Sequence, residues 1–142
     1  MRGPGTARYV LAYLAADTLC VGAGMGVPIF PILLGFVVGW LLPRVVAPAG
    51  SPGHPTRRAI LRAAFLASFY TFLLMLIIWG PTIPMLWDQE ADLANFGIPM
   101  ILYEAKASFI GWEVLMIAIS PFLQLLAIVF GADVRLVRSE TS

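Results

Sequence analysis

Long apolar segments alternate with short polar or proline-rich ones along the whole chain. Four apolar segments stand out, with approximate limits of 8–24, 27–43, 59–80 and 109–131. Each is close to the roughly 20 residues that a helix needs to cross a hydrocarbon core of about 30 Å. The pattern predicts an all-α, four-helix integral membrane protein, with a single transmembrane domain over residues 1–142.

The first two segments are separated by a glycine-rich break at residues 22–28. We therefore expect them to form a tight helical hairpin, followed by two further spans. The two arms are slightly short for a bilayer, which requires local thinning or longer helices. In the alternative interpretation, residues 9–42 form one long broken or re-entrant element. That alternative places arginines on both sides of the membrane.

The basic residues fall on one side of the four-span pattern, with the single exception of Lys106. Because short loops rich in Arg and Lys stay in the cytoplasm, both termini are expected there. The expected location is the cell membrane of a bacterium or archaeon. The cytoplasmic set is Arg2, Arg8, Arg44, Arg57, Arg58, Arg62, Arg135 and Arg138.

Two connecting segments differ in character. Residues 43–58 carry four prolines and two glycines, which favours an extended cytoplasmic linker without stable helix. Residues 81–108 form an outer loop that combines acidic and apolar side chains, and we expect part of it to lie along the membrane interface. Within the last span, Pro121 lacks a backbone donor and predicts a bend.

The N-terminal segment also fits one feature of a secretory signal, because Arg2 and Arg8 precede an apolar stretch. Residues 17–19 lack the small side chains expected before a lipid-modified cysteine at Cys20, and the apolar character continues beyond that point. We expect this segment to remain as the first span.

Composition excludes several classes of function. The chain is 60% hydrophobic and 12% charged, with a mean hydropathy of +0.88, which is too apolar for an ordinary water-soluble domain. A net charge of +1 without a basic patch argues against nucleic-acid binding. One cysteine, Cys20, and one histidine, His54, make neither a disulfide nor a pair of metal or haem ligands. We expect no cofactor, no metal and no enzymatic activity.

The residue with the most chemical interest is Asp17, about nine residues beyond Arg8 and therefore near mid-membrane. A central Asp costs roughly 2.5 to 3.5 kcal/mol on insertion scales, so it should face the bundle interior, find partners or be protonated. At the same depth lie Ser68, Tyr70, Thr71, Ser120 and Gln124, and Tyr70 with Gln124 completes the candidate polar site. A functional interpretation is a proton or cation relay. The structural interpretations are interhelical hydrogen bonding and the capping of a helix end.

Small residues recur at every fourth position in three of the spans. Gly35 and Gly39 form such a pair in the second span, and Ala63 and Ala67 belong to a similar stripe in the third. These stripes permit close approach of helix backbones. They predict helix packing, either within one chain or against another subunit.

The outer loop contains an acidic trio, Asp88, Glu90 and Asp92. Their oxygens suit Ca²⁺ or Mg²⁺, but the spacing is not that of an EF-hand. We expect a solvated acidic surface and leave cation binding as the alternative.

Taken together, these features favour a structural or accessory membrane component that acts through helix–helix contacts. Its expected partners are the lipid bilayer and either further copies of itself or the subunits of a larger membrane complex. The alternative is a small ion or proton conduit that uses Asp17.

Overall fold

The computed structural model describes residues 4–23, 28–46 and 57–140, and in this part of the chain every regular element is helical. The prediction of an all-α protein is confirmed. The elements are α1 (Pro4–Ala23), α2 (Ile29–Val46), α3 (Arg57–Trp79), the 3₁₀ helices η1 (Gly80–Leu86) and η2 (Leu93–Asn95), α4 (Ala105–Val114), the π-helix η3 (Leu115–Ile119) and α5 (Ser120–Glu140).

Three helical segments in the described residues are long and apolar enough to cross a membrane. They are Ile29–Val46, Arg57–Leu86 and Ala105–Ser139, so that α3 continues into η1 while α4, η3 and α5 form one long helix. Helix α1 is not among these three. It has 20 residues, but the charged Arg8 and Asp17 and the polar Thr18 interrupt its apolar sequence.

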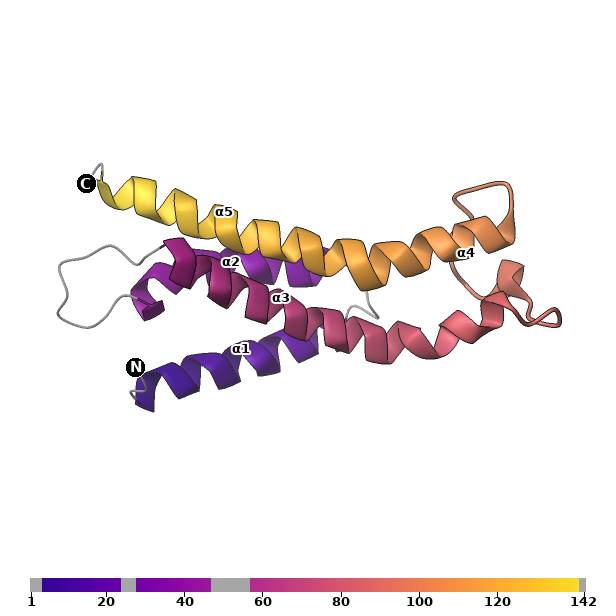
Figure 1. Ribbon diagram of the computed structural model, residues 1–142, viewed down its shortest axis with the longest axis horizontal. Coiled ribbons are helices and arrows are strands. Elements are labelled where there is room, and N and C mark those ends of the chain that lie inside the picture. The colour runs from indigo at the N-terminus through magenta and orange to yellow at the C-terminus, as the bar shows by residue number, and fades with distance from the viewer. Residues whose placement is uncertain (1–3, 24–27, 47–56, 141–142) are drawn as a thin grey trace.

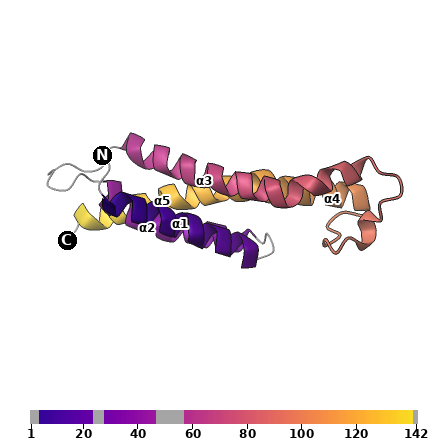
Figure 2. The ribbon, with the colours of Figure 1, turned by 90° about the horizontal axis from the view of Figure 1, so that it is seen from below.

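The helices lie side by side along one long axis (Figure 1). Helices α1 and α2 flank only the half of the molecule that holds the chain ends, while α3 and α4 continue well beyond them in both views (Figure 2). The expected hairpin is present in outline, since α1 ends at Ala23 and α2 begins at Ile29. The turn predicted at 22–28 lies largely outside the described residues.

Helices α2 and α5 make the most extensive contact of the fold, and glycine is the reason that they can. A Cβ placed on Gly35 would lie 2.9 Å from both Cγ and the backbone oxygen of Gln124, and one on Gly39 would lie 2.7 Å from the carbonyl carbon of Ile128. Gly131 of α5 lies in turn against the backbone of α2 at Phe36 and Trp40. The absence of side chains at these glycines therefore lets the two backbones touch.

The interior of the bundle follows one face of each long helix. On α3 the buried positions are spaced three or four apart, as one face of an α-helix requires. On the long helix α4–η3–α5 a comparable line runs through Glu113, Met116, Ser120, Gln124 and Ile128. The α3 face comprises Ile60, Ala64, Ser68, Thr71 and Met75.

The proline in the last span lies next to an irregularity, as predicted. Residues Leu115–Ile119 are π-helical and stand immediately before Ser120 and Pro121. Because Pro121 has no N–H to donate, the turn before it cannot form its full set of α-helical bonds, and a wider turn is one way to accommodate this. Figure 1 shows the axis of this helix changing direction between the α4 and α5 labels.

The linker prediction is wrong at its first residues. Helix α2 does not stop before Pro43 but includes it and continues to Val46. Pro43 stands in the last turns, where few backbone bonds follow it, and the φ angle that its ring imposes is helical, so the helix loses little. The prediction is also wrong at residues 57 and 58, because α3 already begins at Arg57. Residues 47–56 lie outside the described residues.

The outer loop expected at 81–108 ends earlier, because α4 already begins at Ala105. Residues 80–104 connect α3 to α4, and we call them the cap segment. It contains η1 and η2 and little other regular structure. The cap segment exposes several large apolar side chains, with Trp87 74% exposed and Ile101 64% exposed. It is therefore more than a polar connector, in agreement with its apolar composition.

Candidate polar site in the helix bundle

Asp17 is completely buried and lies in the interior of α1, so it does not cap a helix end. The Thr71 hydroxyl donates to its Oδ2 atom over 2.6 Å, and the Gln124 amide donates to its Oδ1 atom over 3.0 Å. Each carboxyl oxygen thus has a donor from a different helix. The Asp17 carboxyl joins α1 to α3 and α5.

Tyr13 belongs to the same network, although the sequence did not single it out. Its hydroxyl donates to the carbonyl oxygen of Ala67 over 3.1 Å and accepts from Nε2 of Gln124 at 3.3 Å. Tyr13 precedes Asp17 by four residues and therefore lies on the same face of α1. That spacing was the available signal.

Of the three residues in the predicted site, Asp17 and Gln124 are in direct contact, while Tyr70 bonds elsewhere. The Tyr70 hydroxyl lies 2.8 Å from Oγ1 of Thr18, which itself donates to the Leu14 carbonyl over 2.7 Å. Because Thr18 gives its hydrogen to Leu14, Tyr70 is the donor of this pair. Thr71, the next residue on α3, takes the place beside Asp17.

Three buried oxygen atoms close to this network have no hydrogen-bond partner in the described part of the chain. They are Oγ of Ser68, Oγ of Ser120 and Oε1 of Gln124. Ser68 precedes Thr71 by three residues on the buried face of α3, and Ser120 precedes Gln124 by four on α5. Because α3 and α5 run in opposite directions, the two serines extend the polar layer toward opposite ends of the bundle (Figure 1).

A second carboxyl group, that of Glu113, is buried where the end of α3 lies beside the beginning of the long helix α4–η3–α5. Glu113 is only 6% exposed, and its Oε1 atom is hydrogen-bonded to the Thr82 hydroxyl. The indole rings of Trp79 and Trp112 meet edge to face nearby, with centroids 6.3 Å apart. Thr82 is thus the hydrogen-bond partner of this buried carboxyl group.

The small residues singled out in the sequence differ in their surroundings. Gly35 and Gly39 are buried and lie against α5 of the same chain. Ala63 and Ala67 are half-buried beside the buried face of α3, and Ala67 offers its carbonyl oxygen to Tyr13. The close approach through the two glycines is thus made inside the chain.

Two carboxylates of the acidic trio, those of Asp88 and Asp92, accept hydrogen bonds in local turns. Asp88 accepts from the backbone N–H of Glu90, and both carboxylate oxygens of Asp92 accept from Asn95. Within the described residues, no three His, Cys, Asp or Glu side chains gather in a way that could hold a metal ion. These carboxylates shape the cap segment.

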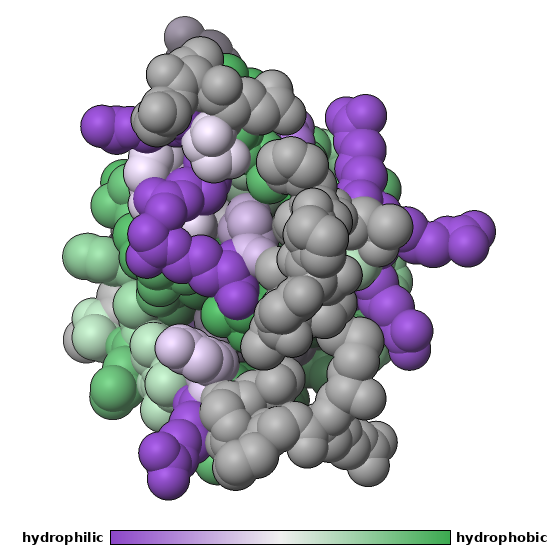
Figure 3. Space-filling model, turned by 90° about the vertical axis from the view of Figure 1, so that its left-hand side faces the viewer, coloured by the Kyte–Doolittle hydropathy of each residue, from purple (hydrophilic) through white to green (hydrophobic). Residues whose placement is uncertain are grey.

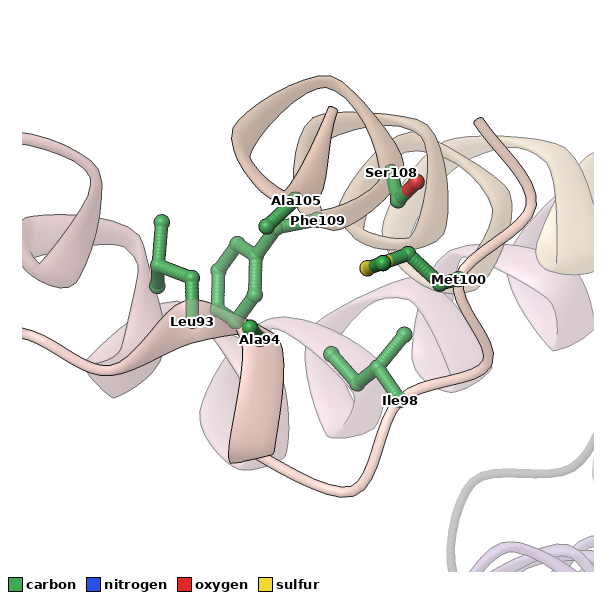
Figure 4. Close-up of a pocket in the computed structure, with 7 residues that line it drawn as sticks. All are labelled: Leu93, Ala94, Ile98, Met100, Ala105, Ser108 and Phe109. Atoms are coloured by element: carbon green, nitrogen blue, oxygen red, sulfur yellow. The ribbon is translucent and has the colours of Figure 1, made fainter. Parts of the chain in front are cut away.

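A small pocket lies between the cap segment and α4 (Figure 4). The Ser108 hydroxyl, the polar group in its lining, donates to the carbonyl of Leu102 and accepts from the N–H of the same residue. The pocket therefore offers an apolar lining without a free reactive group. It is lined by Leu93, Ala94, Ile98, Met100, Ala105, Ser108 and Phe109.

The end of the bundle with the chain termini carries the basic side chains of the helix ends. Figure 3 looks onto this end and shows hydrophilic side chains projecting around it. Trp40 contributes an aromatic platform here, with the guanidinium carbons of Arg135 and Arg138 lying 5.4 and 6.0 Å from its ring centroid. The negative face of the aromatic ring attracts the positive charge of a guanidinium group.

Comparison with protein-family models, curated proteins and solved structures gives no match for this chain.

Proposed function

We propose that the chain is a four-span integral membrane protein that works as a structural or accessory component through helix–helix contacts, in a homo-oligomer or a larger membrane complex. Both termini face the cytoplasm, and the membrane is the cell membrane of a bacterium or archaeon. The function that we propose for the chain includes no enzymatic activity.

The observation that carries this proposal is the way in which the Asp17 carboxyl is used. Both of its oxygens accept hydrogen bonds, and the donors, Thr71 and Gln124, come from two other helices. Apart from Val21, it is the one buried side chain in the described part of α1. Polar contacts of this kind are what attach a weakly packed helix to a bundle.

The four-span arrangement is supported by the depths in the membrane that the helical rise per residue gives for residues on different helices. Residues 114–132 of the long helix carry no charged side chain, and at about 1.5 Å per residue they extend about 28 Å, close to a hydrocarbon core of about 30 Å. Gln124 lies next to the middle of this stretch. Asp17, its hydrogen-bond partner, then lies near mid-membrane, and Arg8 lies about 13 Å away at one boundary.

With the membrane in this position, α1 also crosses it, and the tryptophans lie near its two boundaries. Helix α1 crosses although its composition is less apolar than that of α2. Trp79 and Trp112 fall near the outer boundary and Trp40 near the inner one, as expected for aromatic belts. The cap segment then lies at the outer surface with its exposed apolar side chains at the interface.

The surface of the bundle offers apolar side chains for contacts with helices of other chains. Large apolar side chains are exposed on α1, α3 and α5, among them Leu11, Leu19 and Phe65. In a membrane these side chains meet lipid or another helix. Gly35 and Gly39 are unsuitable as probes of such contacts, because they already pack against α5.

Purification in a mild detergent, with identification of everything that co-migrates, tests the proposal. We expect a stable oligomer or a complex with another membrane protein, with a mass above that of the 15.4 kDa chain. A strictly monomeric particle without partners, recovered from several detergents and from nanodiscs, contradicts the proposal.

A second candidate function, an ion or proton conduit through Asp17, is favoured by the three unpartnered buried oxygens of Ser68, Ser120 and Gln124. These atoms extend a line of polar groups beyond the Asp17 carboxyl in both directions. Buried Met75 and Met116 lie between that line and Glu113, so a conduit needs a step that opens this apolar barrier.

Proteoliposomes test this second candidate. If the chain conducts, Asp17→Asn should suppress the flux, because the amide cannot exchange a proton as a carboxyl does. Thr18→Val is the matched control, since it removes the contact with Tyr70 but leaves both donors to Asp17 in place. Absence of flux in the wild type, or an equal flux in Asp17→Asn, argues against conduction.

A further inference from the structure

We propose that Glu113 is a proton-binding site, with Thr82 as its partner, at the joint between α3 and the cap segment. In this site the Glu113 carboxyl carries a proton at neutral pH and donates it in a hydrogen bond to the Thr82 hydroxyl oxygen. The site does not depend on whether the protein forms oligomers or conducts ions.

The Thr82 hydroxyl group contacts two oxygen atoms that ordinarily accept hydrogen bonds. Its Oγ1 atom lies 2.6 Å from the carbonyl oxygen of Trp79 and is also hydrogen-bonded to Oε1 of Glu113. A hydroxyl group has one hydrogen to donate, and a backbone carbonyl can only accept. Both contacts are satisfied when Thr82 donates to Trp79 and Glu113 donates to Thr82, which requires a protonated Glu113.

The other carboxyl oxygen of Glu113 is poorly placed to carry a negative charge. This Oε2 atom is buried and has no hydrogen-bond partner among the residues that the structure describes. An unpartnered oxygen of an ionised carboxylate costs much more in a buried place than the oxygen of a neutral carboxylic acid. The surroundings of Oε2 therefore favour the neutral form.

Within the described residues, the elements packed around Glu113 bring no positive charge close to it. The last turn of α3, η1 and η3 contain no ionisable side chain. Of the ionisable groups on the rest of the cap segment and the start of α4, Lys106 is the positively charged one, and the others are Asp88, Glu90, Asp92, Tyr103 and Glu104. Lys106 is exposed and lies seven residues, about two helical turns, before Glu113.

Asp17 provides an internal contrast. Its two oxygens accept from two different groups, and each of these groups has a hydrogen of its own to give. The carbonyl oxygen of Ala67, which also faces the Thr71 hydroxyl, is 3.4 Å away and competes weakly with Asp17 at 2.6 Å. The hydrogen count around Asp17 is complete without a proton on its carboxyl group.

The position of the site links protonation to the cap segment. When Glu113 loses its proton, the carboxylate can only accept, and the Thr82 hydrogen turns from Trp79 to Glu113. The Trp79 carbonyl, at the point where α3 ends and η1 begins, then loses its side-chain donor. Alkaline pH should loosen this joint and acidic pH should hold it closed, and in the proposed topology the pH that acts is that of the outer side.

Infrared spectroscopy of the purified chain in lipid tests the proposal, because a carboxylic acid absorbs in a carbonyl region separate from carboxylates and amides. At neutral pH we expect an acid band that Glu113→Gln removes and Asp17→Asn retains. Glutamine keeps the fold in place, since its amide can donate to Thr82 as the acid does. Circular dichroism verifies that both variants are helical.

Substitutions of Thr82 separate the specific hydrogen bond from mere burial. Thr82→Ser keeps the hydroxyl and should leave the acid band where it is, whereas Thr82→Val removes the acceptor and should shift the band. The proposal is overturned if wild-type protein shows no acid band at neutral pH, if Glu113→Gln leaves the band unchanged, or if Asp17→Asn abolishes it.

Discussion

Thr71 provides the shorter of the two hydrogen bonds to Asp17, and its removal should measure what that bond contributes. We expect Thr71→Val to destabilise the protein by roughly 0.6 to 2 kcal/mol, because interhelical hydrogen bonds in membranes have this magnitude and a buried acceptor is left without a donor. Unfolding in mixed micelles as the fraction of denaturing detergent rises provides the measurement.

Thr71→Ser is the matched control and should retain most of the stability, because the hydroxyl remains. Equal stability of the Val variant and the wild type would show that Asp17 does not need this donor.

The sequence indicated which residues could form the polar site, but not which hydrogen bonds they make. Asp17 stood out because a carboxyl in an apolar segment is costly, and Gln124 was placed at the same depth by counting residues. Depth alone could not decide between Tyr70 and Thr71, since neighbouring residues on a helix point about 100° apart. Glu113 could not be recognised as buried, because that depends on where η1 places Thr82.

Helix α2 contacts α5 through glycines, and this contact should tolerate no added side chain at Gly39. A Cβ there would lie 2.7 Å from the carbonyl carbon and 2.8 Å from Cα of Ile128, which are backbone atoms that a side-chain rotation cannot move. We expect Gly39→Ala to destabilise the protein by about 1 to 3 kcal/mol, as overpacking does. The same unfolding titration measures it.

Gly111→Ala is the control at this scale, since Gly111 is also helical but a Cβ there meets nothing within 4 Å. It should be neutral or stabilising by up to about 1 kcal/mol, because alanine is the better helix former. If both alanine variants behave alike, the glycines of α2 do not set the distance between the helices.

At the element scale, apolar periodicity predicted where helices lie more reliably than where they end. The helix through Pro43 and the π-helical turn before Pro121 were not predicted, because proline signals an irregularity without saying how neighbouring turns accommodate it. The glycine pair could not be assigned to one chain or two from spacing alone. That decision depends on the facing residues of α5, among them Gly131.

At the scale of the whole molecule, the all-helical fold followed from composition and pattern, and three related features of the bundle agree with one another. The charge-free stretch of the long helix, the depth of Asp17 and the basic side chains of one end are all consistent with a single membrane position. The sequence did not foretell that α3 and α4 extend past the α1–α2 hairpin. That extension depends on how the cap segment folds.

Compartment labelling tests the central claim, a four-span bundle with both termini in the cytoplasm, most directly. Single cysteines at Ser51 and Ala91, in a Cys20→Ala background, are exposed to a membrane-impermeant maleimide in intact cells and in inverted vesicles. The account predicts labelling of position 91 only from the outer side and of position 51 only from the cytoplasmic side. Labelling of both positions from the same side would contradict it.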